Sequence, residues 1–355
     1  MADILRRAGA HLDEWVAPEI ADELGFLRAG KILEWMDVVG VLAATRHCQK
    51  PVVTASVDGL ELTDPVRVGE RITMTAEVGY TSAKSMGVAV SMTRHARAPG
   101  GPSPTLQGYM TFVALDEEGK SAGVPQLQPE TPEEIARFRE GNVRREFRSK
   151  LASGQLPRPS SAANDDATPD YRLFIRESLK LLPISFRLPW DRPDPTRPRT
   201  RQRSYVHKIE PIRSSKLNFH GTLYGGTLMR WIETNAHLSA RAYLDGAPVR
   251  FAGLHGLTFI RPVTQHVFVH IRSMVVHAAT ESLTVIVNVH AEDPVGGGQE
   301  ETLRAFLTYA PVSASSSAPP RIPPVECQSD EERALFEEVE HRLALQRSLA
   351  RADVG

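Results

Sequence analysis

Two long segments of the chain place apolar residues at three- and four-residue intervals, and shorter segments place them at every second position. In residues 31–46 the apolar series includes Leu33, Met36 and Ala44, and residues 227–244 show the same spacing. This spacing is typical of one buried face of an amphipathic helix. The pattern therefore predicts two long helices, each packed against a core along one side.

The segments that follow each helix alternate with the two-residue period of a half-buried strand. Residues 72–78 alternate cleanly, residues 52–57 are rich in β-branched side chains, and residues 109–115 return as a further strand after a Pro- and Gly-rich stretch at 97–105. One long helix followed by a run of antiparallel strands predicts the α+β class. It argues against alternating β/α units with a parallel sheet.

The second half of the chain repeats the first at a nearly constant separation. Pro65 and Pro262 stand 197 residues apart, and so do Ser85 and Ser282. Constancy across strands, turns and hairpins indicates a duplication. Because only two copies are present, we expect a fused dimer with a pseudo-twofold axis.

The composition of the intervening segments sets the predicted domain boundaries. Residues 154–170 are rich in Pro, Ser, Ala and Asp, which is typical of a linker. The lead-in is predicted to be helical to about Val16. The predicted division is an N-terminal lead-in (1–20), a first module (21–150), a linker (151–203), a second module (204–315) and a C-terminal helical tail (316–355).

Two short polar motifs predict where further helices begin. Thr131 with Glu134, and Ser329 with Glu332, have the Ser/Thr-x-x-Glu spacing of a capping box. The first predicts a helix over about 131–151. The second predicts a helix that begins at Asp330 in the tail.

Composition and charge exclude several classes of function. A formal net charge of -1 argues against a basic nucleic-acid surface. The only two cysteines, Cys48 and Cys327, are far apart, which argues against a disulfide scaffold or a cysteine zinc site and suits a reducing compartment. No apolar run approaches the roughly 20 residues of a membrane span, and the N-terminus lacks a secretory signal. We expect a soluble cytoplasmic protein with no membrane partner.

The loop 218–226 ends in the pair Gly225-Gly226, directly before the second helix. Backbone N–H groups at a helix start are unpaired and can hold a partial negative charge, such as a polarised carbonyl oxygen. On the first helix, Asp37 lies one turn from both Leu33 and Val41, on or beside the apolar face. Its counterpart on the second helix is Glu233.

These residues also have plainer interpretations. Asp37 could pair with Arg46 or Lys31, and Asn218 could simply be a turn residue. The chain has no Gly-x-Ser-x-Gly elbow, so a serine hydrolase is not expected. It has no His-Glu-x-x-His or Cys-x-x-Cys motif, so no metal is expected.

Six motifs resemble those of the acyl-CoA thioesterases with paired hotdog domains, of the cytosolic acyl-CoA hydrolase and acetyl-CoA hydrolase types. The resemblance covers about residues 20–150 and 204–312, and it leaves no room for the lipid-binding domain of some relatives. The motifs are GKILEWMD (30–37), RHC (46–48), VTASVD (53–58), RVGE (67–70), TSAKSM (81–86) and NFHGTLYGG (218–226).

The resemblance implies two tandem hotdog domains, each an antiparallel sheet wrapped around a long helix, with active sites across the interface between them. It implies Asp37 as general base, or as nucleophile through an anhydride, and Asn218 as the amide that orients the water or the carbonyl. The N–H groups of Gly225 and Gly226 would hold the oxyanion. It also implies an acyl-CoA substrate, no cofactor other than CoA as part of that substrate, and a homotrimer. The implied CoA contacts are Ala55, Ser56, Val57, Lys84, Ser85, Met86, Arg148, Arg261 and Pro262.

The first module departs from this pattern at its own loop. Asp22 stands where the second module has Asn218, and the residue facing that loop would be Glu233. Two carboxylates with no amide donor cannot polarise a carbonyl, so we expect this second site to be inactive. Each chain would then have one working site. The second module also replaces Asp58 by His255, and Val68-Gly69 by Gln265-His266.

Two functional hypotheses follow from the sequence. The first is an acyl-CoA thioesterase that releases CoA and a carboxylic acid. The alternative is a non-hydrolytic hotdog protein, either an acyl-CoA binding module or an enoyl-thioester hydratase. Acyl chain length is not predicted.

Overall fold

The computed structural model describes residues 9–96, 101–152, 199–218, 220–296, 298–313 and 320–352. In the first module the elements are β1 (Gly9–Trp15), η1 (Pro18–Ile20), α2 (Ala29–Cys48), β2 (Val52–Leu62), β3 (Arg71–Thr81), β4 (Ser85–His95), β5 (Pro102–Ala114) and α3 (Pro132–Ala152). In the second they are β6 (Arg199–Thr200), η2 (Arg201–Ser204), β7 (Val206–Pro211), η3 (Ser214–Lys216), α5 (Gly225–Tyr243), β8 (Val249–Phe259), β9 (Phe268–Ala278), β10 (Leu283–Glu292), β11 (Gln299–Pro311), β12 (Val325–Glu326) and α6 (Asp330–Ala352).

Ten strands form one continuous sheet whose order is a palindrome of the two modules. The order is β1-β3-β4-β5-β2-β8-β11-β10-β9-β7, and every neighbouring pair is antiparallel. The modules join where β2 pairs with β8, with Val57 opposite Leu257 and Leu60 opposite Leu254. β6 and β12 form a separate parallel pair. The α+β class and the paired hotdog architecture are confirmed.

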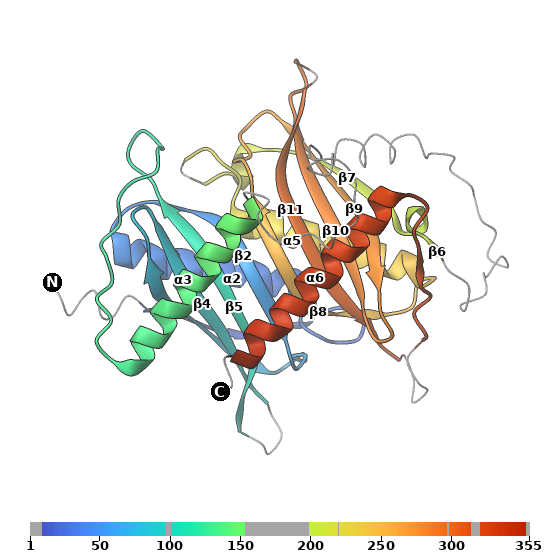
Figure 1. The fold of residues 1–355 in the computed structure, drawn as a ribbon, viewed down its shortest axis with the longest axis horizontal. Helices are drawn as coiled ribbons and strands as arrows, with labels where there is room; N and C mark the ends of the chain where they lie inside the picture. The colour runs from blue at the N-terminus through green and yellow to red at the C-terminus, as the bar shows by residue number, and fades with distance from the viewer. Residues whose placement is uncertain are drawn as a thin grey trace.

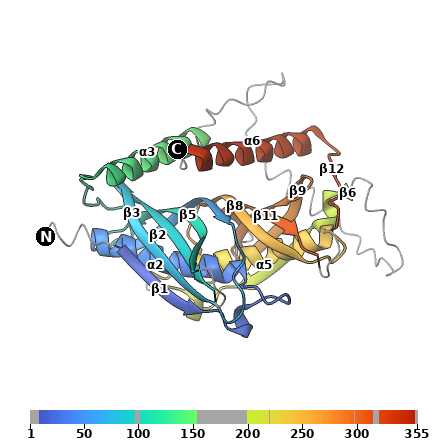
Figure 2. The ribbon, with the colours of Figure 1, turned by 90° about the horizontal axis from the view of Figure 1, so that it is seen from below.

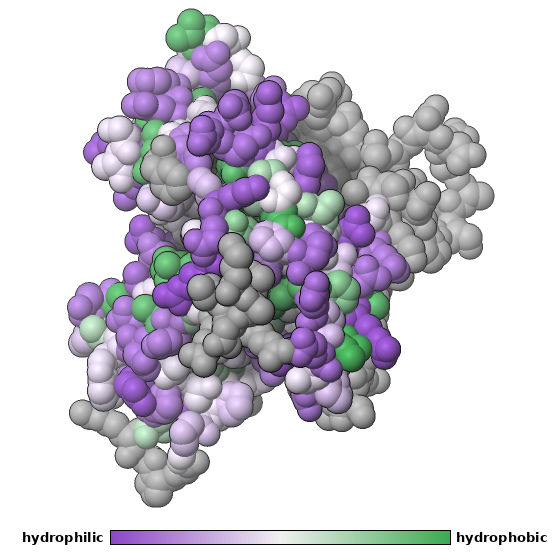
Figure 3. Space-filling view, turned by 90° about the vertical axis from the view of Figure 1, so that its left-hand side faces the viewer, coloured by the Kyte–Doolittle hydropathy of each residue, from purple (hydrophilic) through white to green (hydrophobic). Residues whose placement is uncertain are grey.

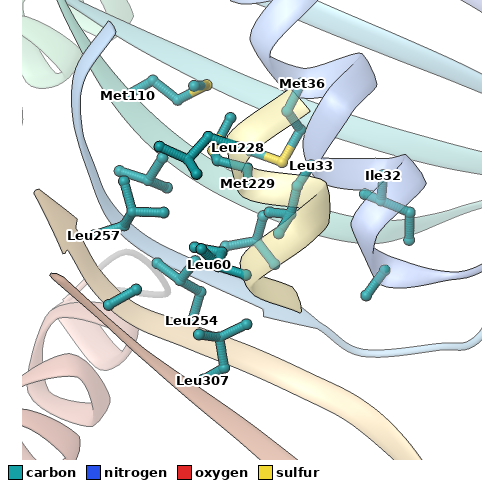
Figure 4. Packing of buried hydrophobic residues seen from close by; sticks show 14 of the residues in the cluster. Ile32, Leu33, Met36, Leu60, Met110, Leu228, Met229, Leu254, Leu257 and Leu307 are labelled. Carbon is teal, nitrogen blue, oxygen red and sulfur yellow. The ribbon is translucent and has the colours of Figure 1, made fainter. Parts of the chain in front are cut away.

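The sheet wraps around α2 and α5, which lie together on one of its faces (Figures 1 and 2). Burial follows the predicted helical face, because Leu33 and Met36 of α2 are each 1% exposed. Figure 4 shows these side chains meeting Leu228 and Met229 of α5 above Leu60 of β2. The core therefore runs without a break across the two modules and fixes the two helices against each other.

The predicted helix in the lead-in is wrong. Residues 9–15 form the edge strand β1, which pairs along β3 from Gly9 opposite Glu77 to Trp15 opposite Arg71. Its equivalent in the second module is β7, which pairs with β9 in the same way. The two-residue period of this short segment is weak, and the pairing with β3 decides its conformation.

The opposite face of the sheet carries α3 and α6 (Figure 2). Both capping boxes are confirmed, because the N–H of Glu134 donates to Thr131 Oγ1 at 3.2 Å and the N–H of Glu332 donates to Ser329 Oγ at 3.2 Å. α6 covers a small apolar cluster on β9, β10 and β11. The strands contribute Met274, Val276, Ile286 and Phe306, and α6 contributes Leu335 and Val339.

Most of the predicted linker, residues 153–198, lies outside the described residues. The end of the molecule formed by the first module is largely hydrophilic, with apolar residues in small separate areas (Figure 3). Within the described ranges, no helix combines the length and the apolar character needed to cross a bilayer.

Candidate active site

The N-terminus of α5 meets the middle of α2 at Asp37. The backbone N–H of Gly226 donates to Asp37 Oδ2 at 2.7 Å, across 189 residues of sequence. A Cβ on Gly226 would stand 3.2 Å from Asp37 Cβ and from the backbone of Glu34. The glycine therefore allows the two helices to approach closely enough for this bond.

The second oxygen of Asp37 is held from β2. The hydroxyl of Thr54 donates to Asp37 Oδ1 at 2.6 Å. The carboxyl is only 5% exposed, and burial raises its pKa, while the bonds from Thr54 and Gly226 oppose that rise. The nearby charge of Glu34 adds a smaller upward effect. A fixed carboxylate with a raised pKa is suited to accept a proton from water.

Sequence reasoning missed Thr54, although it lies next to Ala55, Ser56 and Val57. Its residue type gave no signal, because threonine is common in strands. The position became informative only when β2 was placed beside α2. Neither alternative partner of Asp37 is used, since Lys31 Nζ pairs with Glu34 and the Arg46 Nη1–H donates to the Gly9 carbonyl.

Replacing Thr54 by valine should raise the pKa of Asp37, because the hydroxyl bond that favours the ionised form is lost. We expect the acidic limb of the kcat profile to move to higher pH and kcat to fall about tenfold near neutral pH. A pH–rate series of thioester hydrolysis measures both effects. Thr54→Ser keeps the hydroxyl and should keep the wild-type limb; an unshifted limb in Thr54→Val would show that the bond does not tune the base.

Asn218 lies in the loop that leads to Gly225 and Gly226. Its Oδ1 accepts the N–H groups of His220 and Thr222, at 2.9 and 3.1 Å, and the Thr222 hydroxyl at 3.1 Å. These three donors identify the atom as the amide oxygen, and they show that it is already used within the loop. The amide NH2 is left as the end that can donate to a substrate.

The two glycine N–H groups are not equivalent. The Gly226 N–H is bonded to Asp37, so the expectation of two free donors for an oxyanion is corrected. Gly225 begins α5, where the first N–H groups have no acceptor within the helix. Its N–H is the donor at this end that can face a carbonyl.

Two of the expected CoA contacts lie in the core. Val57 is 1% exposed and Met86 is fully buried. Their side chains pack inside the sheet, so the expected CoA contact at these two positions would have to be made by backbone atoms and remains a prediction. Ala55 is half-buried on β2, and Ser85 bonds to Ser82 across their turn at 2.7 Å.

The polar members of that set are held by partners within the chain. Arg148 of α3 forms an ion pair with Asp58, and Ser56 donates to the same carboxylate at 3.2 Å. Lys84 donates to Ser121 at 3.1 Å. Arg261, beside the exposed Pro262, pairs with Glu300 on the surface at 2.5 Å. The structure brings Ser56 and Arg148 together through Asp58 and leaves Lys84 and Arg261 in separate turns.

A related arrangement stands on the other side of the pseudo-twofold axis. Glu233 of α5 accepts the N–H of Gly30 at the start of α2, and it also accepts the Tyr309 hydroxyl at 3.3 Å. Asp22 builds the same loop as Asn218, because its Oδ1 accepts the N–H groups of Leu24 and Phe26 at 2.9 Å. At this position the second-module loop therefore offers an amide NH2 group, whereas the first-module loop offers a carboxylate oxygen.

A cavity of about 200 Å³ opens beside Glu233. Apolar side chains, including Phe26, Leu62 and Phe251, line it together with Asp22 and His237. Burial raises the pKa of Glu233 to about 7. This carboxyl is therefore partly protonated at neutral pH, unlike an ordinary glutamate.

Because the pKa of Glu233 is raised in the folded state, this residue makes the free energy of unfolding decrease as pH rises. Because the folded state binds this proton more tightly than the unfolded state, the stabilisation is complete below about pH 4.5 and is lost as pH rises through about 7. The difference corresponds to about 3 kcal/mol. Replacing Glu233 by glutamine should flatten the free energy of unfolding between about pH 5 and pH 8, measured by urea denaturation.

The exposed Glu61 offers a matched control, since Glu61→Gln should leave the pH dependence as in the wild type. An unchanged slope in Glu233→Gln would show that this carboxyl titrates normally.

Comparisons with known proteins give the family. The thioesterase superfamily matches residues 24–97 and 220–297, one region in each module. The cytosolic acyl coenzyme A thioester hydrolase of Homo sapiens is 35% identical over 147 residues, which cover 41% of this chain and 39% of that protein. Protein VdlD of Helicobacter pylori is 32% identical over 142 residues, or 39% of this chain and 81% of the relative.

Among solved structures, a hexameric acyl-CoA thioesterase is similar at 32% identity and a TM-score of 0.40, covering 42% of this chain and 95% of its own. The matched part spans well under half the length of the human hydrolase. The resemblance seen in the motifs is confirmed: the chain belongs to the thioesterase superfamily, with two tandem hotdog domains.

Proposed function

We propose that this chain is an acyl-CoA thioesterase that hydrolyses acyl-CoA to free CoA and a carboxylic acid, with one working site per chain. The observation that carries the proposal is the buried Asp37 carboxylate, held from one module by Thr54 and from the other by the Gly226 N–H. The similarity to the cytosolic acyl coenzyme A thioester hydrolase of Homo sapiens supports the same substrate class.

The residues support a water-mediated reaction. Asp37 takes a proton from a water molecule, and the resulting hydroxide attacks the thioester carbonyl carbon. The Asn218 NH2 and the Gly225 N–H donate to the carbonyl oxygen as it becomes negative. The carbon–sulfur bond then breaks, and the CoA thiolate leaves and takes up a proton.

Asp37 is better suited to act as base than as nucleophile. Each of its oxygens already accepts one strong hydrogen bond, from Thr54 and from Gly226. Attack on carbon would require one oxygen to leave these bonds and come within bonding distance of the carbonyl carbon. A proton can instead be taken up by a free lone pair of an oxygen that keeps its position. The reaction needs no cofactor other than the CoA of the substrate.

Thiol release from a series of acyl-CoA esters, from acetyl-CoA to palmitoyl-CoA, tests the proposal. We expect one CoA and one carboxylic acid per substrate consumed, with a maximum at one chain length. Tight binding of acyl-CoA with no CoA released at any chain length would instead support the binding module. Hydration of an enoyl-CoA without thiol release would support the hydratase.

The proposal includes a cytoplasmic homotrimer, as the resemblance implies. Equivalent positions on α2 and α5 expose apolar side chains, since Leu42 is 41% and Leu238 50% exposed, and Val38 beside them is 45% exposed. Such surfaces favour association with further copies of the chain. Light scattering of the purified protein would give its assembled mass.

A further inference from the structure

The outer face of the second module's sheet carries an arginine, an asparagine and a histidine where the first module has small hydroxyl side chains. The pairing register sets Arg272 of β9 opposite Asn288 of β10, and His270 opposite His290. We call Arg272, Asn288 and His290 the β9–β10 cluster. At the equivalent positions, 197 residues earlier, the first module has Thr75, Ser91 and Thr93, and Thr73 in place of His270.

The cluster is buried, and several of its polar atoms have no hydrogen-bond partner among the residues that the structure describes. Arg272 is 3% exposed; its Nη2 donates to Gln299 Oε1 at 3.0 Å, and the guanidinium also interacts with the Tyr205 hydroxyl. Its Nε and Nη1 have no well-formed hydrogen bond among the described residues. Asn288 is 1% exposed and His290 is 7% exposed. Within the described ranges, neither the amide atoms of Asn288 nor the Nδ1 of His290 have a hydrogen-bond partner. The first-module pair differs, since Thr75 and Ser91 satisfy each other at 2.8 Å.

The acids that face the cluster are committed elsewhere. Glu292 pairs with His270 and accepts from Gln299 at 3.0 Å. Glu301 accepts two donors from Arg304, at 2.7 and 2.9 Å. The charge of Glu292 acts on Arg272, but no carboxylate in the described part of the chain forms an ion pair with its guanidinium. A buried guanidinium in this state is unfavourable, which points to a bound anion as its missing partner.

The electrostatics of the surrounding groups agree. Burial, together with the charge of Arg272, lowers the pKa of His290 to about 4. Burial and Arg272 also lower the pKa values of His207 and His270, and Tyr205 lies beside the same guanidinium. With Arg304, Glu292 and Glu301, these are the titratable groups that face the cluster. The positive charge of the site therefore comes from Arg272, while the imidazoles are neutral.

We propose that the β9–β10 cluster binds a phosphate-class oxyanion on the outer face of the second module, remote from Asp37 in the fold. The Nε and Nη1 groups of Arg272, the NH2 of Asn288 and Nδ1 of His290 donate to its oxygens. Donors from three side chains on two strands suit an anion with oxygens in several directions better than a planar carboxylate. The exposed His207 and Gln299 border the cluster and give an approach from solvent.

Titration calorimetry of the full chain with inorganic phosphate and with adenosine 3′,5′-bisphosphate, at ionic strength held constant with potassium chloride, tests the site. We expect saturable binding of one anion per chain. The double variant Arg272→Thr/Asn288→Ser places the first-module residue types at both positions and should weaken anion binding at least tenfold. Arg139→Gln, which removes an exposed charge on α3, should bind as the wild type does.

The two probes distinguish the source of the phosphate. Equal affinity supports a site for free phosphate, and at least tenfold tighter binding of the bisphosphate supports a phosphate carried by a nucleotide. Binding that acetate or chloride reproduces, or that the double variant retains, overturns the proposal. If the double variant does not fold, Arg272→Lys serves, since a lysine lacks the second donor direction and should weaken binding similarly.

An independent readout follows the imidazole of His290 by NMR. Phosphate should raise its pKa from about 4, because the anion offsets the charge of Arg272. A titration curve of His290 that phosphate leaves in place would contradict the assigned contact. Neither measurement depends on hydrolysis, so failure here is distinct from failure of the thioesterase proposal.

Discussion

Replacing Asp37 by asparagine should lower kcat for acyl-CoA hydrolysis about a thousandfold while leaving the chain folded. Asparagine has the same shape and can still accept the Gly226 N–H, so the contact between α2 and α5 is kept. It cannot take a proton from water near neutral pH, and removing a positioned general base typically costs 10²–10⁴-fold. Thiol release under saturating substrate measures the loss.

Glu34 provides the matched control, because it lies one turn earlier on α2 and pairs with Lys31 at 3.0 Å. Glu34→Gln removes a carboxylate of the same helix and should keep the plateau value of kcat within about twofold. Because the charge of Glu34 contributes to the raised pKa of Asp37, the acidic limb should move to slightly lower pH. Binding of a non-hydrolysable acyl-CoA analogue should survive in Asp37→Asn. If Asp37→Asn hydrolysed acyl-CoA at nearly the wild-type rate, Asp37 would not be the general base.

Changing Asn218 to aspartate should lower kcat about a hundredfold or more without unfolding the loop. The Oδ1 bonds to His220 and Thr222 remain possible, because Asp22 makes the equivalent bonds to Leu24 and Phe26 in the first module. The donor is lost, and one donor to a developing oxyanion is worth about 3–4 kcal/mol. The added carboxylate charge would disfavour the oxyanion further. Steady-state kinetics with a thermal melt separates this effect from loss of structure.

The same chemical exchange in the other loop, Asp22→Asn, is the control. It alters the Glu233 side of the molecule and should leave hydrolysis at the Asp37 site unchanged. Equal losses in Asn218→Asp and Asp22→Asn would mean that both loops serve the reaction, and that the assignment of one working site per chain is wrong.

Much of the scaffold follows from local pattern. The faces of α2 and α5, the two capping boxes and the 197-residue repeat are properties of short windows or of simple comparison, so the sequence predicts them. Asp37 could be placed on a buried helical face for the same reason. The lead-in could not be predicted, because the strand conformation of β1 depends on pairing with β3, about 60 residues away in sequence.

The amino-acid order alone determined the duplicated α+β architecture. It also placed Asp37 on the buried face of a helix and Asn218 in a loop before a glycine pair. Only the tertiary structure decided that the Gly226 N–H belongs to Asp37, that Thr54 holds the other oxygen, and that Val57 and Met86 are core residues. It also decided that the β9–β10 cluster is buried with several polar atoms that have no hydrogen-bond partner in the described part of the chain. The physical reason is distance along the chain: periodicity reports which side of an element faces the core, whereas a hydrogen bond between modules depends on how closely their backbones approach.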